Sequence, residues 1–206
     1  MRTKIDIHRP ALQYDLREEG VAGENNETLP PTVVVYGVPR GGTTMVAGIV
    51  QRCGVDIGLN LPVNLEDPDF VAKKPAEMIE TIRHRNQEKA IWGWKFPRAA
   101  NYLPAVHEEI RNPHYIVVWR DIFSTGLRPM RRGGDIIESL RHAHTIQRIN
   151  IDTMKKVPGR YLLVSYEKAV LDPWALAEDI SAFVGTELKA DRDELIAFAK
   201  PGSYKS

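Results

Sequence analysis

The segment Val33–Val50, VVVYGVPRGGTTMVAGIV, joins two apolar stretches through a glycine-rich turn. The first stretch is a run of β-branched and aromatic residues, which is typical of a buried strand. The second stretch resumes after the turn with apolar residues at helical spacing. A strand, a glycine turn and a helix onset bring unpaired backbone amides to the edge of a sheet, so the segment predicts an anion-binding turn.

Four short apolar segments recur along the chain, each separated from the next by enough residues for a helix: TVVVYG, AIWGWKF, HYIVVWR and RYLLVSY. Such continuous runs suit parallel strands that are covered on both faces. The predicted fold is therefore α/β, a three-layer sandwich with a mainly parallel central sheet of about four or five strands, like that of P-loop NTPases. The predicted helices are Thr43–Arg52, Pro75–Asn86, Leu103–Arg111, Asp135–Lys155, Pro173–Val184 and Asp191–Ala199.

The size and composition of the chain predict one globular domain. With 206 residues, of which 43% are hydrophobic, we expect an N-terminal arm, residues 1–31, and one α/β domain, residues 32–206. The net charge of +1 predicts no nucleic-acid partner. No stretch approaches the roughly 18 apolar residues of a membrane span and the N-terminus lacks a signal-like apolar centre, so we expect a cytoplasmic protein. The single cysteine, Cys53, is expected to pack in the core.

The turn itself combines backbone access with hydroxyl groups and one cation. Its glycines allow a phosphate to approach the backbone closely, and two threonines follow at the helix onset. These residues are Gly37, Gly41, Gly42, Thr43 and Thr44. Their spacing matches the nucleotide-binding loop G-x-x-x-x-G-K-[ST], except that a threonine stands in place of the lysine. Instead, an arginine at position 40 lies inside the turn, where its planar fork can bridge a transferred group and its leaving phosphate.

The motif GVPRGGTTM resembles the phosphosulfate loop of sulfotransferases, commonly G-x-P-[RK]-S-G-T-T, with Gly41 in place of the serine. The resemblance continues in the same order through GWKFPR, YIVVWRD and YLLVSYEKAVLDPWALAEDISAFVG, and it covers roughly Val33 to Gly185. It implies 3′-phosphoadenosine 5′-phosphosulfate as the donor, adenosine 3′,5′-bisphosphate as the product, and no metal. The donor-binding residues that it implies in the turn are Pro39, Arg40, Gly41, Gly42, Thr43 and Thr44.

A second anion site is expected at Arg120, which directly follows the segment YIVVW. In the family this arginine binds the 3′-phosphate of the donor together with a serine eight residues later. That later position is Arg128 here, so either Arg128 supplies a charge instead, or Ser124 comes within reach from a displaced helix. By the same resemblance, the C-terminal residues Lys200, Gly202 and Lys205 could form a shortened cover for this phosphate.

The acceptor hydroxyl needs a base, and the histidine of the family's K-T-H segment is missing from WKFPR. Carbohydrate and protein sulfotransferases frequently use a glutamate, and the loop segment NLEDPDF resembles an acidic segment of bacterial sulfotransferase-like proteins. We therefore favour Glu66 as the base, with Asp67 next and the predicted helix residues His142 and His144 as further alternatives. Helix capping is the competing explanation for either acid.

The resemblance also places Lys95 beside the sulfuryl group, where its charge would stabilise the breaking S–O bond. The resulting hypothesis is a sulfotransferase that acts on a hydroxyl of a carbohydrate, a glycoconjugate or another small molecule, with Arg40, Glu66 and Lys95 as catalytic residues. Two alternatives stay open. A P-loop nucleotide kinase or NTPase would explain the turn, and a nucleotide-binding protein without catalysis would explain the departures from the family pattern. The sequence does not indicate an oligomeric state.

Overall fold

The structure is a computed structural model that describes residues 6–17, 28–130 and 133–202. A five-stranded sheet, in the order β1-β5-β4-β2-β3, forms its centre. The strands are β1 (Ala11–Asp15), β2 (Thr32–Gly37), β3 (Trp92–Lys95), β4 (Pro113–Trp119) and β5 (Arg160–Ser165). The pairs β3·β2, β2·β4 and β4·β5 are parallel, whereas β1 runs antiparallel to β5. The carboxyl ends of β2, β3, β4 and β5 therefore lie at one edge of the sheet.

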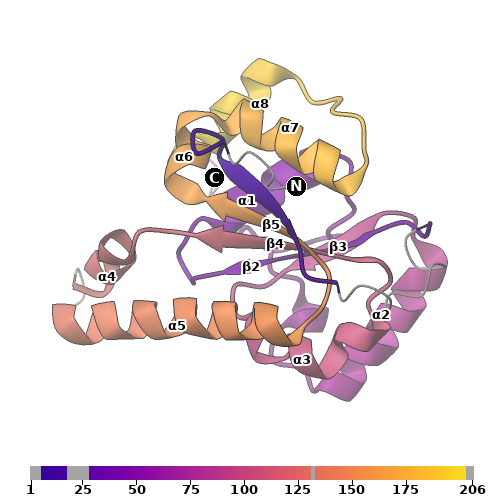
Figure 1. Ribbon diagram of the computed structural model, residues 1–206, viewed down its shortest axis with the longest axis horizontal. Helices are drawn as coiled ribbons and strands as arrows, with labels where there is room; N and C mark the ends of the chain where they lie inside the picture. Colours follow the sequence, from indigo (N-terminus) through magenta and orange to yellow (C-terminus); the bar gives the residue numbers. More distant parts are fainter. Residues whose placement is uncertain (1–5, 18–27, 131–132, 203–206) are drawn as a thin grey trace.

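Helices cover both faces of this sheet, as Figure 1 shows. One face carries α1 (Thr43–Arg52), α6 (Tyr166–Leu171), α7 (Pro173–Val184) and α8 (Arg192–Ala199). The other face carries α2 (Pro75–Glu88), α3 (Leu103–Val106) and α5 (Ile136–Lys156). The helix α4 (Ile122–Met130) follows β4 and packs against α5, and three short 3₁₀ helices are η1 (Pro68–Phe70), η2 (Ala99–Asn101) and η3 (His107–Glu109). The predicted three-layer α/β fold is confirmed.

The continuous apolar strands are explained by two hydrophobic cores, one on each face of the sheet. Along β2, Val33 and Val35 join the core beneath α1 and α7, while Val34 and Tyr36 join the core beneath α2 and α3. All four side chains are fully buried. Both faces of the strand therefore need apolar side chains, which removes the alternation that a half-exposed strand would show. Cys53 is buried in the first of these cores, as expected.

The segment that we expected to be an irregular arm contributes β1 to the sheet. Its five residues pair with β5 from Ala11 opposite Val164 to Asp15 opposite Arg160. The strand lies at the edge of the sheet, and its side chains are exposed or partly buried. An edge strand of this kind needs no apolar run, because its backbone bonds to the neighbouring strand hold it in place. This explains why the pattern of the sequence did not reveal it.

The helix bounds agree closely with the sequence prediction, with three exceptions. The helix expected at Leu103–Arg111 ends at Val106 and continues as the 3₁₀ turn η3, because Val106 leaves the helical region with φ −127° and ψ −6°. The helices α4 and α6 were not predicted. The helix α4 is separated from β4 by two residues and α6 begins directly after β5, with Asp121 and Ser165 respectively accepting a hydrogen bond from the first turn. These two short helices help to form the carboxyl edge of the sheet.

Candidate active site

The predicted anion-binding turn connects β2 to α1 at the carboxyl edge of the sheet. Gly42 precedes α1 with φ 97°, a left-handed conformation, and a Cβ atom at this position would collide with the ring of Tyr166. Arg40 also has a positive φ, of 63°, and Gly41 donates its amide to the carbonyl oxygen of Val38 over 2.8 Å. Together with Pro39, these residues form a tight turn. Only glycine fits at position 42 of this turn.

The N-terminus of α1 is free to bind an anion. Among the described residues no side chain caps this end of the helix, and its first turn contains no acidic residue. The first amides therefore present a partial positive charge at the end of the turn. Thr43 is buried in the position of the P-loop lysine, so the ammonium group typical of ATP-binding loops is absent from the turn itself.

Lys95 brings an ammonium group to this helix from the neighbouring strand β3. Its Nζ lies 3.4 Å from Thr44 Oγ1, 3.0 Å from the carbonyl oxygen of Asn64 and 3.0 Å from Glu66 Oε1. The lysine side chain is only 1% exposed, and this burial lowers its pKa, as does the charge of Arg40, while Glu66 opposes the shift. The structure therefore brings together Lys95, Glu66, Thr44 and the turn.

Glu66 reaches this position from the long loop that follows α1. Its amide donates to the Asn64 side-chain oxygen over 3.2 Å, and the Asn64 carbonyl also accepts a hydrogen bond from Thr44 Oγ1. The Glu66 side chain is 24% exposed, so an acceptor can reach it. Asn64 was not identified from the sequence, because its contribution is a backbone carbonyl and side-chain chemistry gives no signal for it.

The second predicted cation, Arg120, lies against the same turn. Its Nη1 donates to the carbonyl oxygen of Arg40 over 2.9 Å, and its guanidinium group lies over the ring of Tyr166, 4.4 Å from the centroid. Its Nε atom is buried and has no hydrogen-bond partner among the described residues, while Glu167 Oε1 lies 4.0 Å away. The guanidinium group thus makes one hydrogen bond and one ion pair among the described residues, which leaves N–H donors that make no hydrogen bond there. Tyr166, which supports both Arg120 and Gly42, was not predicted as a site residue.

The two candidates for the serine position differ in what the structure shows. Ser124 donates its amide to Asp121 Oδ2 over 2.7 Å at the start of α4, and this bond is the first cause of a lowered pKa of the Asp121 carboxyl. Its side chain also bonds to Asp121, so it is already engaged. The side chain of Arg128 lies outside the described residues. The choice between them stays a prediction.

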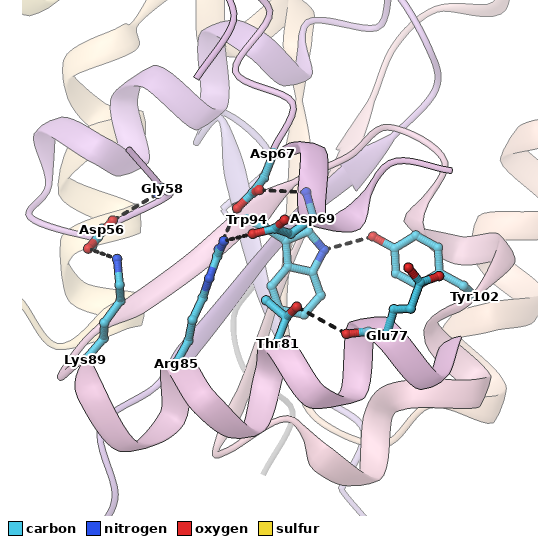
Figure 2. Close-up of polar contacts among 10 residues, drawn as sticks. All are labelled: Asp56, Gly58, Asp67, Asp69, Glu77, Thr81, Arg85, Lys89, Trp94 and Tyr102. Atoms are coloured by element: carbon cyan, nitrogen blue, oxygen red, sulfur yellow. Dashed lines mark hydrogen bonds and ion pairs between the residues drawn. The ribbon is translucent and has the colours of Figure 1, made fainter. Parts of the chain in front are cut away.

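The other candidate bases lie in different surroundings from Glu66. Asp67 is 2% exposed, accepts the Asp69 amide, and contacts Arg85 Nη1 over 2.5 Å (Figure 2). It therefore caps η1 and binds a cation on the far side of the loop. His142 and His144 are exposed on α5. Glu66 is thus the one of these four that contacts Lys95.

The predicted C-terminal cover of the 3′-phosphate is not decided by the described residues. Lys200 and Gly202 are exposed after α8, whereas Lys205 lies outside the described part of the chain, so the C-terminal cover stays a prediction.

Within the described residues, no three or more His, Cys, Asp or Glu side chains gather where they could hold a metal ion. No helix in this part of the chain has the length and hydrophobicity needed to cross a bilayer.

Comparison with known proteins supports the fold through solved structures alone. No family model matches the chain, and no curated protein matches it. The sulfotransferase domain of a Synechococcus olefin synthase is 20% identical over 86% of this chain and 80% of that domain, with a TM-score of 0.56. A Mycobacterium tuberculosis sulfotransferase is 13% identical over 84% of this chain and 72% of the other, with a TM-score of 0.52. The chain has the sulfotransferase fold, as the motif resemblance predicted.

Proposed function

We propose that this protein is a sulfotransferase that moves a sulfuryl group from 3′-phosphoadenosine 5′-phosphosulfate to an acceptor hydroxyl. The observation that carries the proposal is the placement of Lys95, Glu66 and Arg120 around one anion-binding turn. A donor with two phosphate-bearing ends needs two neighbouring cationic sites. The uncapped helix α1 with Lys95 supplies one site, and Arg120, whose guanidinium group makes one hydrogen bond among the described residues, supplies the other.

The residues around the turn fit this donor, which would supply the sulfuryl group together with a bisphosphate leaving group. We assign the phosphosulfate end to the first amides of α1 with Thr43 and Thr44, because an uncapped helix N-terminus binds anions. Arg120 is assigned to the 3′-phosphate, since a guanidinium group binds phosphate oxygens through several N–H donors. Arg40, inside the turn, would stabilise charge on the leaving phosphate.

Glu66 and Lys95 have complementary parts in the proposed transfer. Glu66 uses Oε1 for Lys95, so we assign Oε2 to the proton of the acceptor hydroxyl. Lys95 is held by Glu66, by Thr44 and by the Asn64 carbonyl, and its ammonium group would stabilise charge on the equatorial oxygens of the transferred group. A buried ammonium acts more strongly on such charge than an exposed one, because water screens it less.

A carbohydrate or glycoconjugate is the acceptor that we propose, and this rests on the carboxylate base that Glu66 would provide. Phe96 directly follows Lys95 along the chain and pairs with Tyr102, with ring centroids 6.0 Å apart, and both side chains are partly exposed. Apolar ring surfaces suit the C–H faces of a sugar, and a carboxylate suits its hydroxyl groups. A cytoplasmic location, tested by fractionation, is also part of the proposal.

The direct test is transfer of labelled sulfate from the donor to a panel of sugar and phenol acceptors in the absence of metal. Transfer to a hydroxyl acceptor supports the proposal, and preference for sugars supports the acceptor class. Hydrolysis of ATP that depends on Mg²⁺, without any sulfuryl transfer, would favour the kinase or NTPase alternative instead. Donor binding without transfer to any acceptor would favour the non-catalytic alternative.

A further inference from the structure

The long loop between α1 and α2 is attached to two different parts of the molecule. On its inner side, the Asn64 carbonyl and the Glu66 carboxylate contact Lys95. On its outer side, the loop is attached to the last two turns of α2 by Arg85 and Lys89, which lie one helical turn apart on the same face (Figure 2). The inner side belongs to the proposed active site, and the outer side does not.

Lys89 fixes the beginning of this loop through Asp56. The Lys89 ammonium lies 2.5 Å from Asp56 Oδ2, and the Gly58 amide donates to Asp56 Oδ1 over 2.9 Å. Asp56 also forms an isolated β-bridge with Trp92, at the start of β3. These contacts of Asp56 therefore fix the position at which the loop leaves the edge of the sheet.

Arg85 fixes the end of the loop by bridging two carboxylates. Its Nη1 lies 2.5 Å from Asp67 Oδ2, and its Nη2 lies 2.7 Å from Asp69 Oδ2. The side chains of Arg85 and Asp67 are 14% and 3% exposed, so water screens this pair weakly. Asp67 Oδ1 also accepts the Asp69 amide, which closes the turn η1. One guanidinium group thus holds the N-cap and the middle residue of that turn.

Two kinds of contact hold the outer side of the loop: the ion pairs of Arg85 and Lys89, and the fully buried ring of Phe70 in η1, which shares a core with Ile82 of α2. A pocket of about 300 Å³ lies between the loop and the end of α2, and its lining includes Gly58, Leu59, Arg85 and Lys89. Where a pocket separates two elements, packing contacts across it are missing. The ion pairs of Arg85 and Lys89 cross this gap, whereas Phe70 packs beside it.

From this arrangement we propose that Arg85 is a positioning residue that holds Glu66 against Lys95. Asp67 is the next residue after Glu66, so the bridge from Arg85 to Asp67 and Asp69 fixes the backbone from which the Glu66 side chain extends. Arg85 does not touch the acceptor or the donor in this assignment. The catalytic consequence rests on the proposed function, whereas the positioning of the loop over Lys95 can be measured without any transfer reaction.

The substitution Arg85→Lys tests the bridge while keeping the positive charge. A lysine carries a single point charge and cannot span Asp67 and Asp69 as the planar fork does. The matched control is Arg83→Lys. Arg83 lies on the same helix and binds Glu109 through two hydrogen bonds of 2.9 and 2.6 Å, but Glu109 belongs to η3 and not to the loop. Asp67→Asn is a second variant that weakens the same bridge and retains an oxygen for the cap.

The readout is the rate at which an acetylating reagent modifies Lys95, measured by peptide mass spectrometry on the protein without donor. Lys95 is 1% exposed, so it should react only when the loop moves away. The reactivity of Cys53, which is fully buried beneath α1, reports global unfolding in the same sample. We expect Arg85→Lys and Asp67→Asn to raise the Lys95 rate by about tenfold, with Cys53 still protected and with Arg83→Lys unchanged.

Two results would overturn the positioning role. Lys95 could stay as protected in both variants as in the parent and the control, which would show that the bridge does not hold the loop. Alternatively, Lys95 and Cys53 could become reactive together in both variants, which would show that the bridge supports the whole fold. If the parent catalyses transfer, Arg85→Lys should also lower kcat by about tenfold and leave the Kd of adenosine 3′,5′-bisphosphate unchanged. A parent without transfer would refute the proposed function and leave the labelling result valid.

Discussion

Arg111 and Arg120 flank the two ends of β4, yet their guanidinium groups have opposite surroundings. Arg111, at the amino edge of the sheet, donates hydrogen bonds to the carbonyl oxygens of Pro30, Asn86, Lys89 and Ala90. The guanidinium group of Arg120, at the carboxyl edge, makes one hydrogen bond among the described residues, to the Arg40 carbonyl, and its Nε lies 4.0 Å from Glu167 Oε1.

This difference separates an arginine that holds the chain from one to which we assign a ligand. Arg111 uses four of its five N–H donors on carbonyl oxygens, so it cannot bind a phosphate through them without breaking bonds within the protein. A guanidinium group with a single hydrogen bond keeps N–H donors that a phosphate can accept. The two edges of the sheet also differ in charge. Lys95 and Glu66 form an ion pair at the carboxyl edge, whereas the buried His114 at the amino edge is neutral.

The largest expected effect belongs to Glu66 at the carboxyl edge. Glu66→Gln removes the proposed base while keeping the shape of the side chain, so transfer should fall by about 10²- to 10⁴-fold. The Kd of adenosine 3′,5′-bisphosphate should change little, because Glu66 is not assigned to the donor. The measurement is kcat beside calorimetry. An unchanged transfer rate would place the base elsewhere, and His142 and His144 would be tested next.

Arg40→Ala should lower kcat by about 10²- to 10³-fold, since the guanidinium is assigned to charge that develops on the leaving phosphate. Product binding should weaken less than turnover does. Arg40→Lys, which retains the charge, is the control and should keep part of the activity. If Arg40→Ala transfers sulfate at the parent rate, the cation in the turn is structural and the comparison of the two edges fails at this residue.

Arg111→Ala should affect stability and spare the ligand sites. It removes hydrogen bonds from a charged donor to four carbonyl oxygens, so we expect the free energy of unfolding to fall by about 3 kcal/mol. Urea denaturation measures this change. The Kd of the bisphosphate, measured on the folded fraction, should stay near that of the parent. A loss of binding without a loss of stability would reverse the roles assigned to Arg111 and Arg120.

His114 should make stability depend on pH at the amino edge. Burial lowers its pKa to about 4, so the unfolded chain binds a proton more readily than the folded chain does. The contribution of His114 to stability is complete above its usual pKa of 6.5, and it is lost as the pH falls toward about 4, with a maximum of about 3 kcal/mol. Urea denaturation between about pH 7 and pH 4.5 measures the slope. His114→Gln should flatten it, and an unchanged slope would contradict a neutral buried histidine.

Much of this fold could be predicted from the sequence, because its main elements carry their own signals. The strands of the parallel core are continuous apolar runs, and the turn before Thr43 shows its glycines directly. The strand β1 gave no such signal, since its residues are exposed and its position depends on the edge of β5. The helices α4 and α6 span only nine and six residues, which is too short for an apolar repeat to be recognised in the sequence.

The site residues that belong to a local motif could be predicted from the sequence. Contacts between residues far apart in the sequence were harder to predict. The turn, Lys95 and Arg120 each follow a predicted strand, so their shared edge could be inferred from the parallel topology. The contact between Glu66 and Lys95 joins residues 29 positions apart through a loop. The partner of Asp67 on α2, and the ring of Tyr166 beneath Arg120, depend on packing that no local pattern specifies.

The central claim is that Arg120 and the turn form two adjacent sites for one donor, and calorimetry without metal tests it most directly. Adenosine 3′,5′-bisphosphate should bind about tenfold or more tightly than AMP, because a charge-assisted contact to the 3′-phosphate contributes about 1.5 to 3 kcal/mol. Arg120→Ala should remove most of this preference while the protein stays folded. Equal affinity of the unmutated protein for the bisphosphate and for AMP would contradict the claim.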